Sequence, residues 1–156
     1  MFSLIITIIS IALVAALALA TIYYGGNAFN KGSAEAKASQ LINEGQQING
    51  AVAMFNADSV SGADLKGTTF AASDDIANLS PTYLAQTPAG WTGTATKAMA
   101  TVTGVKGAVC DAVNAKAGIA SRAADEATAF GATGPAKGKV YGCFGAADAN
   151  TVFYKF

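Results

Sequence analysis

The chain has 156 residues, with ten basic residues, ten acidic residues and no histidine. This length fits one domain, or one small domain preceded by a helix. The balanced charge argues against a nucleic-acid ligand, because phosphate binding needs a clustered cationic surface and the basic residues are scattered apart from Lys137 and Lys139.

Residues 1–24 form an uninterrupted apolar run with no charged residue, no glycine and no proline. As a helix this run would reach roughly 36 Å, enough to cross a hydrocarbon core about 30 Å thick. The hydroxyls of Thr7, Ser10 and Thr21 can each bond a backbone carbonyl one turn back, so they need no water. The run therefore predicts a membrane-spanning helix.

Three fates are open to this helix: it stays in the bilayer, it is cleaved off, or it leaves the bilayer and packs against copies of itself. A secretory signal peptide has a basic n-region and a shorter apolar core. The first basic residue here is Lys31, which argues against a signal peptide.

Gly25 and Gly26 predict an interruption of the helix near residues 25–32, because each glycine costs about 1 kcal/mol relative to alanine in a helix interior. Ser33 then has the character of an N-cap, and an amphipathic helix is expected over about 33–56. Its apolar face needs a sheet or another layer to cover it. That face consists of Leu41, Gly45, Ile48, Val52 and Phe55.

Beyond residue 56 the sequence has short apolar alternations separated by Gly, Ser, Thr, Asp and Asn, which is typical of strands joined by loops. We expect a short helix over 106–117 and a loop over 131–138. The expected strands are 67–72, 94–103, 140–144 and 151–156, of which the last two form a hairpin joined by 145–150.

The predicted fold class is α+β, with a long N-terminal hydrophobic helix packed on a small antiparallel sheet. Two parts are expected. Residues 1–30 form a hydrophobic assembly or transmembrane helix. Residues 31–156 form a globular head that includes the amphipathic continuation of the helix.

The two cysteines, Cys110 and Cys143, both lie in the second half of the chain. If the N-terminal helix crosses a membrane and this half is exported to an oxidising compartment, the pair forms a disulfide. The alternative is two reduced thiols in a cytoplasmic domain.

The order of these features resembles that of a mature type IV pilin. In that family a cleaved prepilin begins with a long hydrophobic helix, the outer half of the helix packs on an antiparallel sheet, and a disulfide closes a region near the C-terminus. The counterparts here are the run 1–24, the stripe within 41–55 and the cysteine pair. The start at methionine and the ending Gly142-Cys143-Phe144-Gly145, followed by 151–154, are similar to the type IVb group.

The sequence departs from the family at position 5. A glutamate usually stands there and pairs with the N-terminal amine of a neighbouring subunit, whereas this chain has Ile5 and no acidic residue before Glu35. That salt bridge therefore has no counterpart in this sequence.

The resemblance implies a homo-oligomer, a helical filament of many copies, that forms after a stage in the inner membrane. It also implies a prepilin peptidase and the pilus assembly machinery as partners. The expected location is an extracellular filament on a bacterial surface, with roles such as adhesion, motility or interaction with DNA or phage. Alanines would let the helices approach closely, and tyrosine rings would pack against neighbours. The expected assembly surface comprises Met1, Phe2, Ile5, Ala12, Ala15, Ala16, Ala20, Tyr23 and Tyr24.

An enzyme is hard to build from this sequence, and we expect no catalytic residue, metal or cofactor. There is no histidine that could act as a general base or bind a metal, and two cysteines alone make no usual zinc site. The acidic pair Asp125-Glu126 is more typical of a loop or a helix cap than of a catalytic dyad. Residues 131–139 fail the spacing of a phosphate-binding loop.

Two functional hypotheses remain. The first is a structural filament subunit. The second is a monomeric single-pass membrane protein with an exported binding head.

Overall fold

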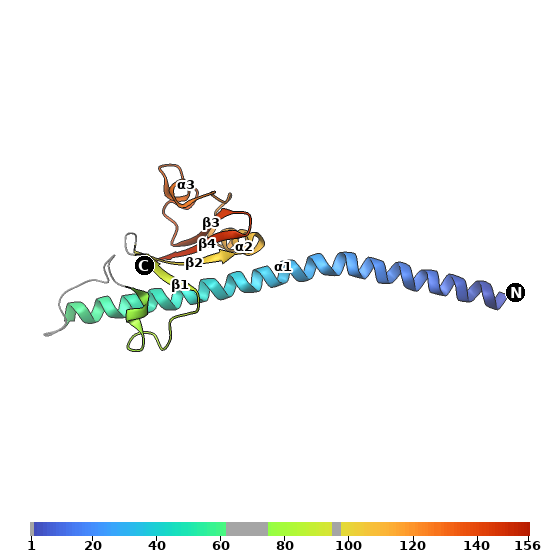
Figure 1. Cartoon of the computed structure of the whole chain (residues 1–156), viewed down its shortest axis with the longest axis horizontal. Helices are drawn as coiled ribbons and strands as arrows, with labels where there is room; N and C mark the ends of the chain where they lie inside the picture. Colours follow the sequence, from blue (N-terminus) through green and yellow to red (C-terminus); the bar gives the residue numbers. More distant parts are fainter. Residues whose placement is uncertain (1, 62–74, 95–97) are drawn as a thin grey trace. The chain divides into compact units, whose positions relative to one another are not determined.

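The computed structural model describes residues 2–61, 75–94 and 98–156, with the side chains of 59–61 and 94 excepted. Within these ranges the chain is α+β, with one long helix, a four-stranded antiparallel sheet and short helices (Figure 1). It divides into two compact units, Met1–Ala34 and Glu35–Phe156. The elements in order are α1 (Phe2–Ser61), η1 (Ile76–Leu79), β1 (Trp91–Thr94), β2 (Met99–Val105), α2 (Gly107–Ala117), α3 (Glu126–Phe130), β3 (Tyr141–Ala146) and β4 (Ala149–Lys155).

Helix α1 is continuous through Gly25 and Gly26, so the predicted interruption near 25–32 is wrong, as is the N-cap at Ser33. The glycines do cost helix stability, but stretches rich in alanine and leucine, 11–20 and 34–41, continue the same helix on both sides. Breaking the helix there would leave backbone groups unpaired and would require a second costly nucleation. The propensity penalty of two residues is therefore smaller than the cost of ending one helix and starting another.

The sheet has the strand order β1-β2-β4-β3, and every neighbouring pair is antiparallel. Strand β4 therefore lies in the middle although it comes last in the sequence. The predicted C-terminal hairpin is confirmed as β3 and β4, whose register runs from Tyr141 opposite Tyr154 to Ala146 opposite Ala149. Its turn is shorter than the expected connection 145–150, because both strands extend further toward it.

One face of the sheet packs against the part of α1 that belongs to the second unit. Leu41, Ile48 and Val52, from the predicted stripe, are buried. A Cβ at Gly45 would collide with the ring of Tyr154, so the glycine allows helix and strand to approach closely. The indole Nε1 of Trp91 in β1 donates to Glu44 Oε2 at 2.8 Å. The stripe predicted from the 3–4 spacing is thus the face that joins helix and sheet.

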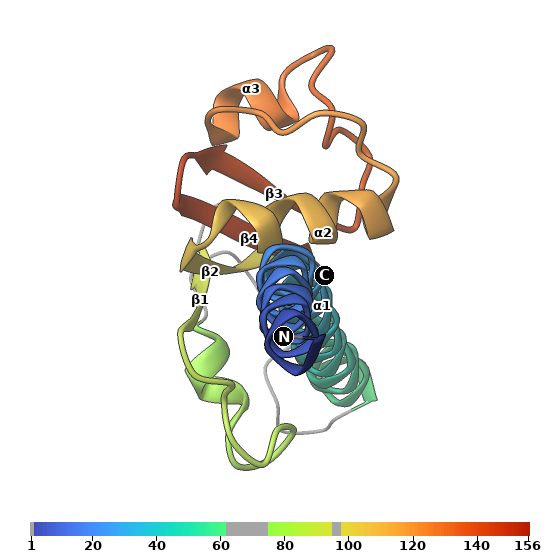
Figure 2. The ribbon, with the colours of Figure 1, turned by 90° about the vertical axis from the view of Figure 1, so that its right-hand side faces the viewer.

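The opposite face of the sheet carries a second apolar layer that includes α3 (Figures 1 and 2). Phe153 of β4 is fully buried there, and the Phe130 ring meets it edge-on with centroids 4.8 Å apart. The buried members of this cluster are Met99, Ile119, Ala123, Ala129, Ala136, Phe144 and Phe153. The head is therefore a sheet covered on both faces.

Helix α2 confirms the helix expected over 106–117, and its Val109, Cys110 and Val113 are buried. Residues 131–138 form a loop, as expected. Strand β2 overlaps the expected strand 94–103 but begins at Met99, and the strand expected over 67–72 lies outside the described residues.

Candidate functional site in the exposed apolar helix

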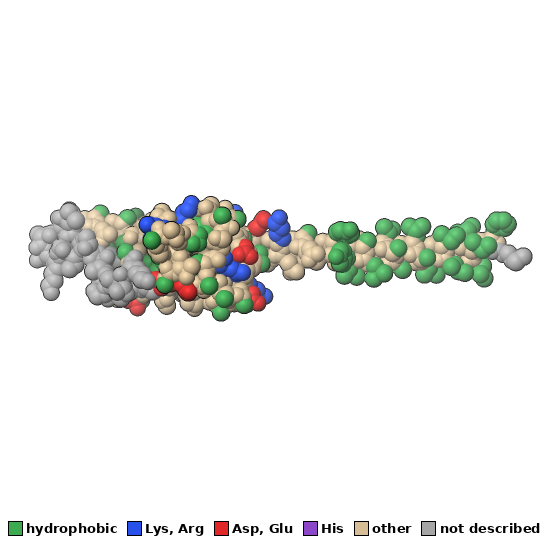
Figure 3. Space-filling model, turned by 90° about the horizontal axis from the view of Figure 1, so that it is seen from above, with side chains coloured by type: hydrophobic (Ala, Val, Ile, Leu, Met, Phe, Trp, Pro, Cys, Tyr) green, Lys and Arg blue, Asp and Glu red, His purple; other side chains and the backbone are tan. Residues whose placement is uncertain are grey.

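Residues 2–33 of the first unit form an apolar helix whose side chains are all exposed. Every residue from 2 to 33 is exposed, including Phe2 at 85% and Ile5 at 53% of their full accessible area. Large apolar side chains point to every side of the helix, so it has no polar face. In Figure 3 hydrophobic side chains cover the outer part of this segment, and charged side chains are visible only near its inner end, where Lys31 is the first charged residue of the sequence.

The hydroxyl groups inside the apolar run are satisfied within the helix. The Oγ atoms of Thr7, Ser10 and Thr21 donate to the carbonyl oxygens of Leu4, Ile6 and Ala18, at 2.9, 2.8 and 2.9 Å. The predicted back-bonding is therefore confirmed for all three. A helix with internally paired hydroxyls can enter a medium without water at low cost.

The predicted assembly residues, apart from Met1, which lies outside the described residues, all belong to this exposed segment. Ala12, Ala16 and Ala20 follow one another at intervals of four, so they share a side of the helix, while Ala15 lies about 100° away from Ala16. The Tyr23 and Tyr24 rings touch edge to face, with centroids 5.4 Å apart. The other predicted assembly residues, Phe2 and Ile5, are exposed near the start of the helix.

Gly25 and Gly26 lie in open space within the helix, since a Cβ on either would meet nothing within 4 Å. They leave the helix surface without side chains just beyond the two tyrosine rings. Their role is therefore not to admit a close neighbour within this chain.

The disulfide between Cys110 and Cys143 is present and joins α2 to β3, with Cα atoms 5.3 Å apart. Asn114, one turn further along α2, reinforces the same link. Its Oδ1 accepts from the Cys143 backbone N–H at 2.7 Å, and its Nδ2 donates to the Cys143 carbonyl at 2.9 Å. Because β3 is an edge strand, the Asn114 amide takes the place of a neighbouring strand at this point.

A second buried amide fixes the β3–β4 turn. Asn150 is fully buried, and its Nδ2 donates to the carbonyls of Val105 and Ala147 at 2.8 and 2.7 Å. Its Oδ1 accepts from Arg122 at 3.0 Å. Neither amide was singled out from the sequence, because all their partners except Ala147 lie 28 to 45 residues away and leave no local pattern.

Of the acidic pair Asp125-Glu126, Asp125 acts as a helix cap. Asp125 Oδ1 accepts from the Thr128 backbone N–H at 2.7 Å at the start of α3. That backbone hydrogen bond holds the pKa of Asp125 below its ordinary value.

Tyr83 is a second described residue whose pKa departs from its ordinary value. Partial burial and, second, the hydrogen bond to Asp58 raise the pKa of its phenol. Both shifts follow from local structural contacts.

The glycine-rich stretch 131–139 has no free cradle of amides for a phosphate. The N–H groups of Gly134, Ala136 and Lys137 donate to carbonyls at 3.0 to 3.1 Å, and the Lys137 ammonium donates to Ala132 at 3.0 Å. These donors are used to hold the loop itself. Across the described ranges no cluster of three or more His, Cys, Asp or Glu residues could hold a metal ion.

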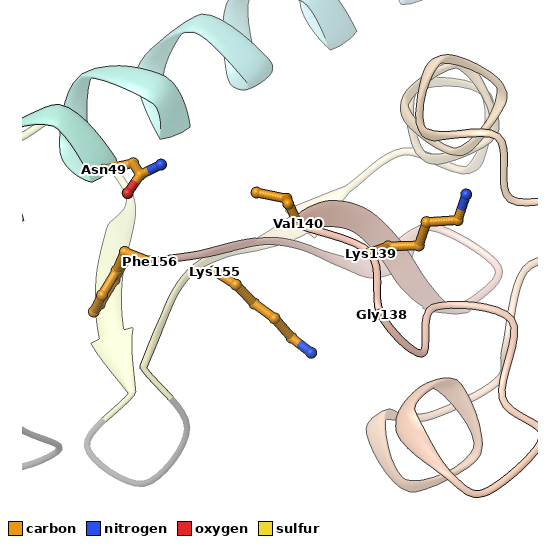
Figure 4. Close-up of a pocket in the computed structure, with 6 residues that line it drawn as sticks. All are labelled: Asn49, Gly138, Lys139, Val140, Lys155 and Phe156. Carbon is orange, nitrogen blue, oxygen red and sulfur yellow. The ribbon is translucent and has the colours of Figure 1, made fainter.

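A shallow hollow of about 390 Å³ lies between α1 and the end of β4. Figure 4 shows its two lysine side chains pointing apart, and the Lys155 ammonium lies 4.1 Å from the centroid of the Phe130 ring. The cations therefore do not converge on a common ligand position. The hollow is lined by Asn49, Gly138, Lys139, Val140, Lys155 and Phe156.

The helix of residues 2–33 is thus the feature that the rest of the described chain leaves without a structural role. Within the described residues, one helix, α1, is long and apolar enough to cross a membrane by length and composition. In shape, the apolar helix, the small antiparallel sheet and the disulfide are pilin-like. No family model matches the chain, and no curated protein and no solved structure is detectably similar to it.

Proposed function

We propose that this protein is the structural subunit of a helical cell-surface filament that forms when the apolar parts of α1 from many copies pack together. Before assembly the same helix holds the subunit in the inner membrane. The head then lies on the outside of the filament, where it contacts the surroundings and serves a role such as adhesion or motility. The resemblance to type IV pilins adds a prepilin peptidase and an assembly machinery as partners.

The single observation that carries the proposal is the uninterrupted exposure of residues 2–33 on every side of the helix. Such a segment leaves on the order of 1,500 Å² of apolar surface to be covered, which at ~25 cal/mol per Å² is tens of kcal/mol as an upper bound. A water-exposed monomer could not tolerate this. Lipid or other copies of the helix must cover it.

The construction of the head supports the proposal in a second way. Its core is formed from its own residues, and the disulfide and Asn114 fix α2 to the sheet. The core of the head therefore needs no contact with residues 2–33. A subunit built like this can leave the bilayer and enter a polymer without unfolding.

The test is a charge placed in the middle of the apolar segment. Ala16→Asp puts a carboxylate where no neighbouring group can pair it, at a cost of about 2.5–3.5 kcal/mol in a bilayer centre, and a similar conflict in a packed helical core. We expect cells that make this variant to yield no filaments in negatively stained, sheared surface material. The head should stay folded, with its disulfide formed.

A matched control is Ala53→Asp, which places the same charge on an exposed position of α1 within the head. We expect normal filaments from this control. Filaments of normal number from Ala16→Asp would contradict a helical core. Recovery of the unaltered protein exclusively in membrane fractions would favour the monomeric single-pass alternative.

A further inference from the structure

We infer that Tyr23 and Tyr24 are an interfacial anchor that sets how far α1 enters a lipid bilayer, with their two rings at the level of the lipid headgroups. This inference rests on the membrane-inserted stage of the proposed function. It adds a specific depth and names the residues that fix it.

The first support is length. From Phe2 to Tyr23 the helix rises by roughly 32 Å at ~1.5 Å per residue, which matches a hydrocarbon core of about 30 Å. This stretch has no charged residue, and the hydroxyls of Thr7, Ser10 and Thr21 are bonded to the helix itself. The tyrosines therefore stand where the hydrocarbon ends.

The second support is the geometry of the two rings. They are exposed to 72% and 74%, and they meet edge to face. Successive helix residues point about 100° apart, so the pair covers two sides of the helix at one level. Tyrosine favours this level because its ring is apolar and its hydroxyl needs polar partners.

The third support is the change in composition after the rings. Gly25, Gly26 and Asn27 offer no large apolar side chain, Phe29 is the one large apolar side chain between the rings and Lys31, and Lys31 is the first charge. The layer of headgroups adds about 5–7 Å on each side of the hydrocarbon core, whereas Lys31 lies about 10 Å beyond Tyr24 along the helix axis. Its ammonium group is then free to lie in water or against lipid phosphates.

Lipid fits this surface better than one neighbouring chain does. The apolar side chains of residues 2–22 point to all sides of the helix. A single partner would cover one side and leave the others in water, whereas a bilayer covers all of them at once. The two rings are accordingly proposed to contact the lipid interface and not a neighbouring chain.

The experiment measures depth in the full chain reconstituted in phosphatidylcholine vesicles. Trp91, the one tryptophan, is 5% exposed within the head, so lipid quenchers should leave its fluorescence unchanged. Tyr24→Trp adds a reporter at the proposed interface, and Leu13→Trp adds one at the middle of the span. Each is measured with a headgroup nitroxide lipid and with a lipid brominated near the chain ends.

We expect the reporter at position 24 to be quenched more strongly by the headgroup nitroxide and the reporter at position 13 more strongly by the deep bromines. Stronger quenching of position 24 by the deep bromines, or no quenching by either lipid, would overturn the anchor. The unaltered chain supplies the background from Trp91.

A second variant tests whether the rings themselves set the depth. In the background Tyr23→Leu/Tyr24→Leu, a reporter introduced by Leu19→Trp should shift toward the deep quencher, because the helix has lost its stop. An unchanged quenching ratio would assign the stop to the polar residues beyond the rings and overturn the inference.

The outcomes separate this inference from the proposed function. Correct depth in a protein that never forms filaments would refute the filament and leave the anchor intact. Filaments from a protein whose reporters show the wrong depth would refute the anchor and leave the filament intact.

Discussion

In residues 2–33 every side chain is exposed, whereas in the described part of residues 35–156 buried apolar side chains form layers on both faces of a sheet. The first region is held by hydrogen bonds between residues four apart, so its structure depends on local sequence alone. The second depends on partners that are far away in sequence, such as Asn114 with Cys143 and Trp91 with Glu44. The same substitution should therefore have different effects in the two regions.

The largest expected effect is the loss of the disulfide. Closing a loop of about 34 residues is worth roughly 3.5–4 kcal/mol in the chain-entropy treatment. We expect Cys110→Ala/Cys143→Ala to lower the free energy of unfolding of the head by about that amount, measured by urea titration with Trp91 fluorescence. The helicity of residues 2–33 in detergent should not change, and an unaltered unfolding midpoint would contradict the expected contribution.

Removal of the Asn114 amide should cause the second-largest loss in the stability of the head. Asn114→Leu leaves the N–H and the carbonyl of Cys143 buried without that partner, and we expect a loss of about 2–3 kcal/mol in the same titration. The matched substitution in the other region, Asn30→Leu, changes an exposed residue and should leave the titration of the head unaltered. Equal losses from both variants would show that the edge-strand contact has no special role.

Gly25→Ala/Gly26→Ala should stabilise the apolar helix by about 2 kcal/mol, because each glycine costs about 1 kcal/mol in a helix interior and each new methyl group enters open space. Amide hydrogen exchange of the full chain in detergent micelles would report slower exchange around residues 20–30. Unchanged exchange there would mean that the glycines do not limit the local stability of the helix.

The smallest effect is expected from the same substitution at Gly45. There the new Cβ would lie 2.7 Å from Cγ of Tyr154, so the strand or the ring must shift. Overpacking costs about 1–3 kcal/mol and exceeds the gain in helix propensity, which leaves a net loss of about 1 kcal/mol in the urea titration. Gly50→Ala is the matched control, because its Cβ would meet nothing within 4 Å, and it should be neutral or stabilising. A stabilising Gly45→Ala would show that the helix–sheet contact is loose.

The sequence predicted features that depend on local periodicity or on strong composition. The apolar run, the stripe of Leu41, Ile48 and Val52, helix α2 and the C-terminal hairpin all follow from spacings within one element. The Cys110–Cys143 bond followed from there being two cysteines and a helix suited to a membrane.

Other features were missed because their cause lies outside the local sequence. Strand β1 has the sequence Trp-Thr-Gly-Thr, which is short and contains glycine, and it is a strand because β2 pairs with it. Helix α3 has five residues, and Asp125 caps it, although the pair Asp125-Glu126 alone does not show a helix. The break at Gly25 and Gly26 was predicted wrongly because propensity was considered without the cooperativity of the flanking helix.

Strand β4 lies between β2 and β3, although it is the last of the four in the sequence. During synthesis, a nascent chain that has reached only β3 therefore has two strands whose shared neighbour does not yet exist. The sheet cannot close until residues 149–155 emerge, whereas α1 can form as soon as it leaves the ribosome. The order of synthesis thus lets the apolar helix form before the head acquires its fold, and it leaves β2 and β3 exposed to wrong pairing for that interval.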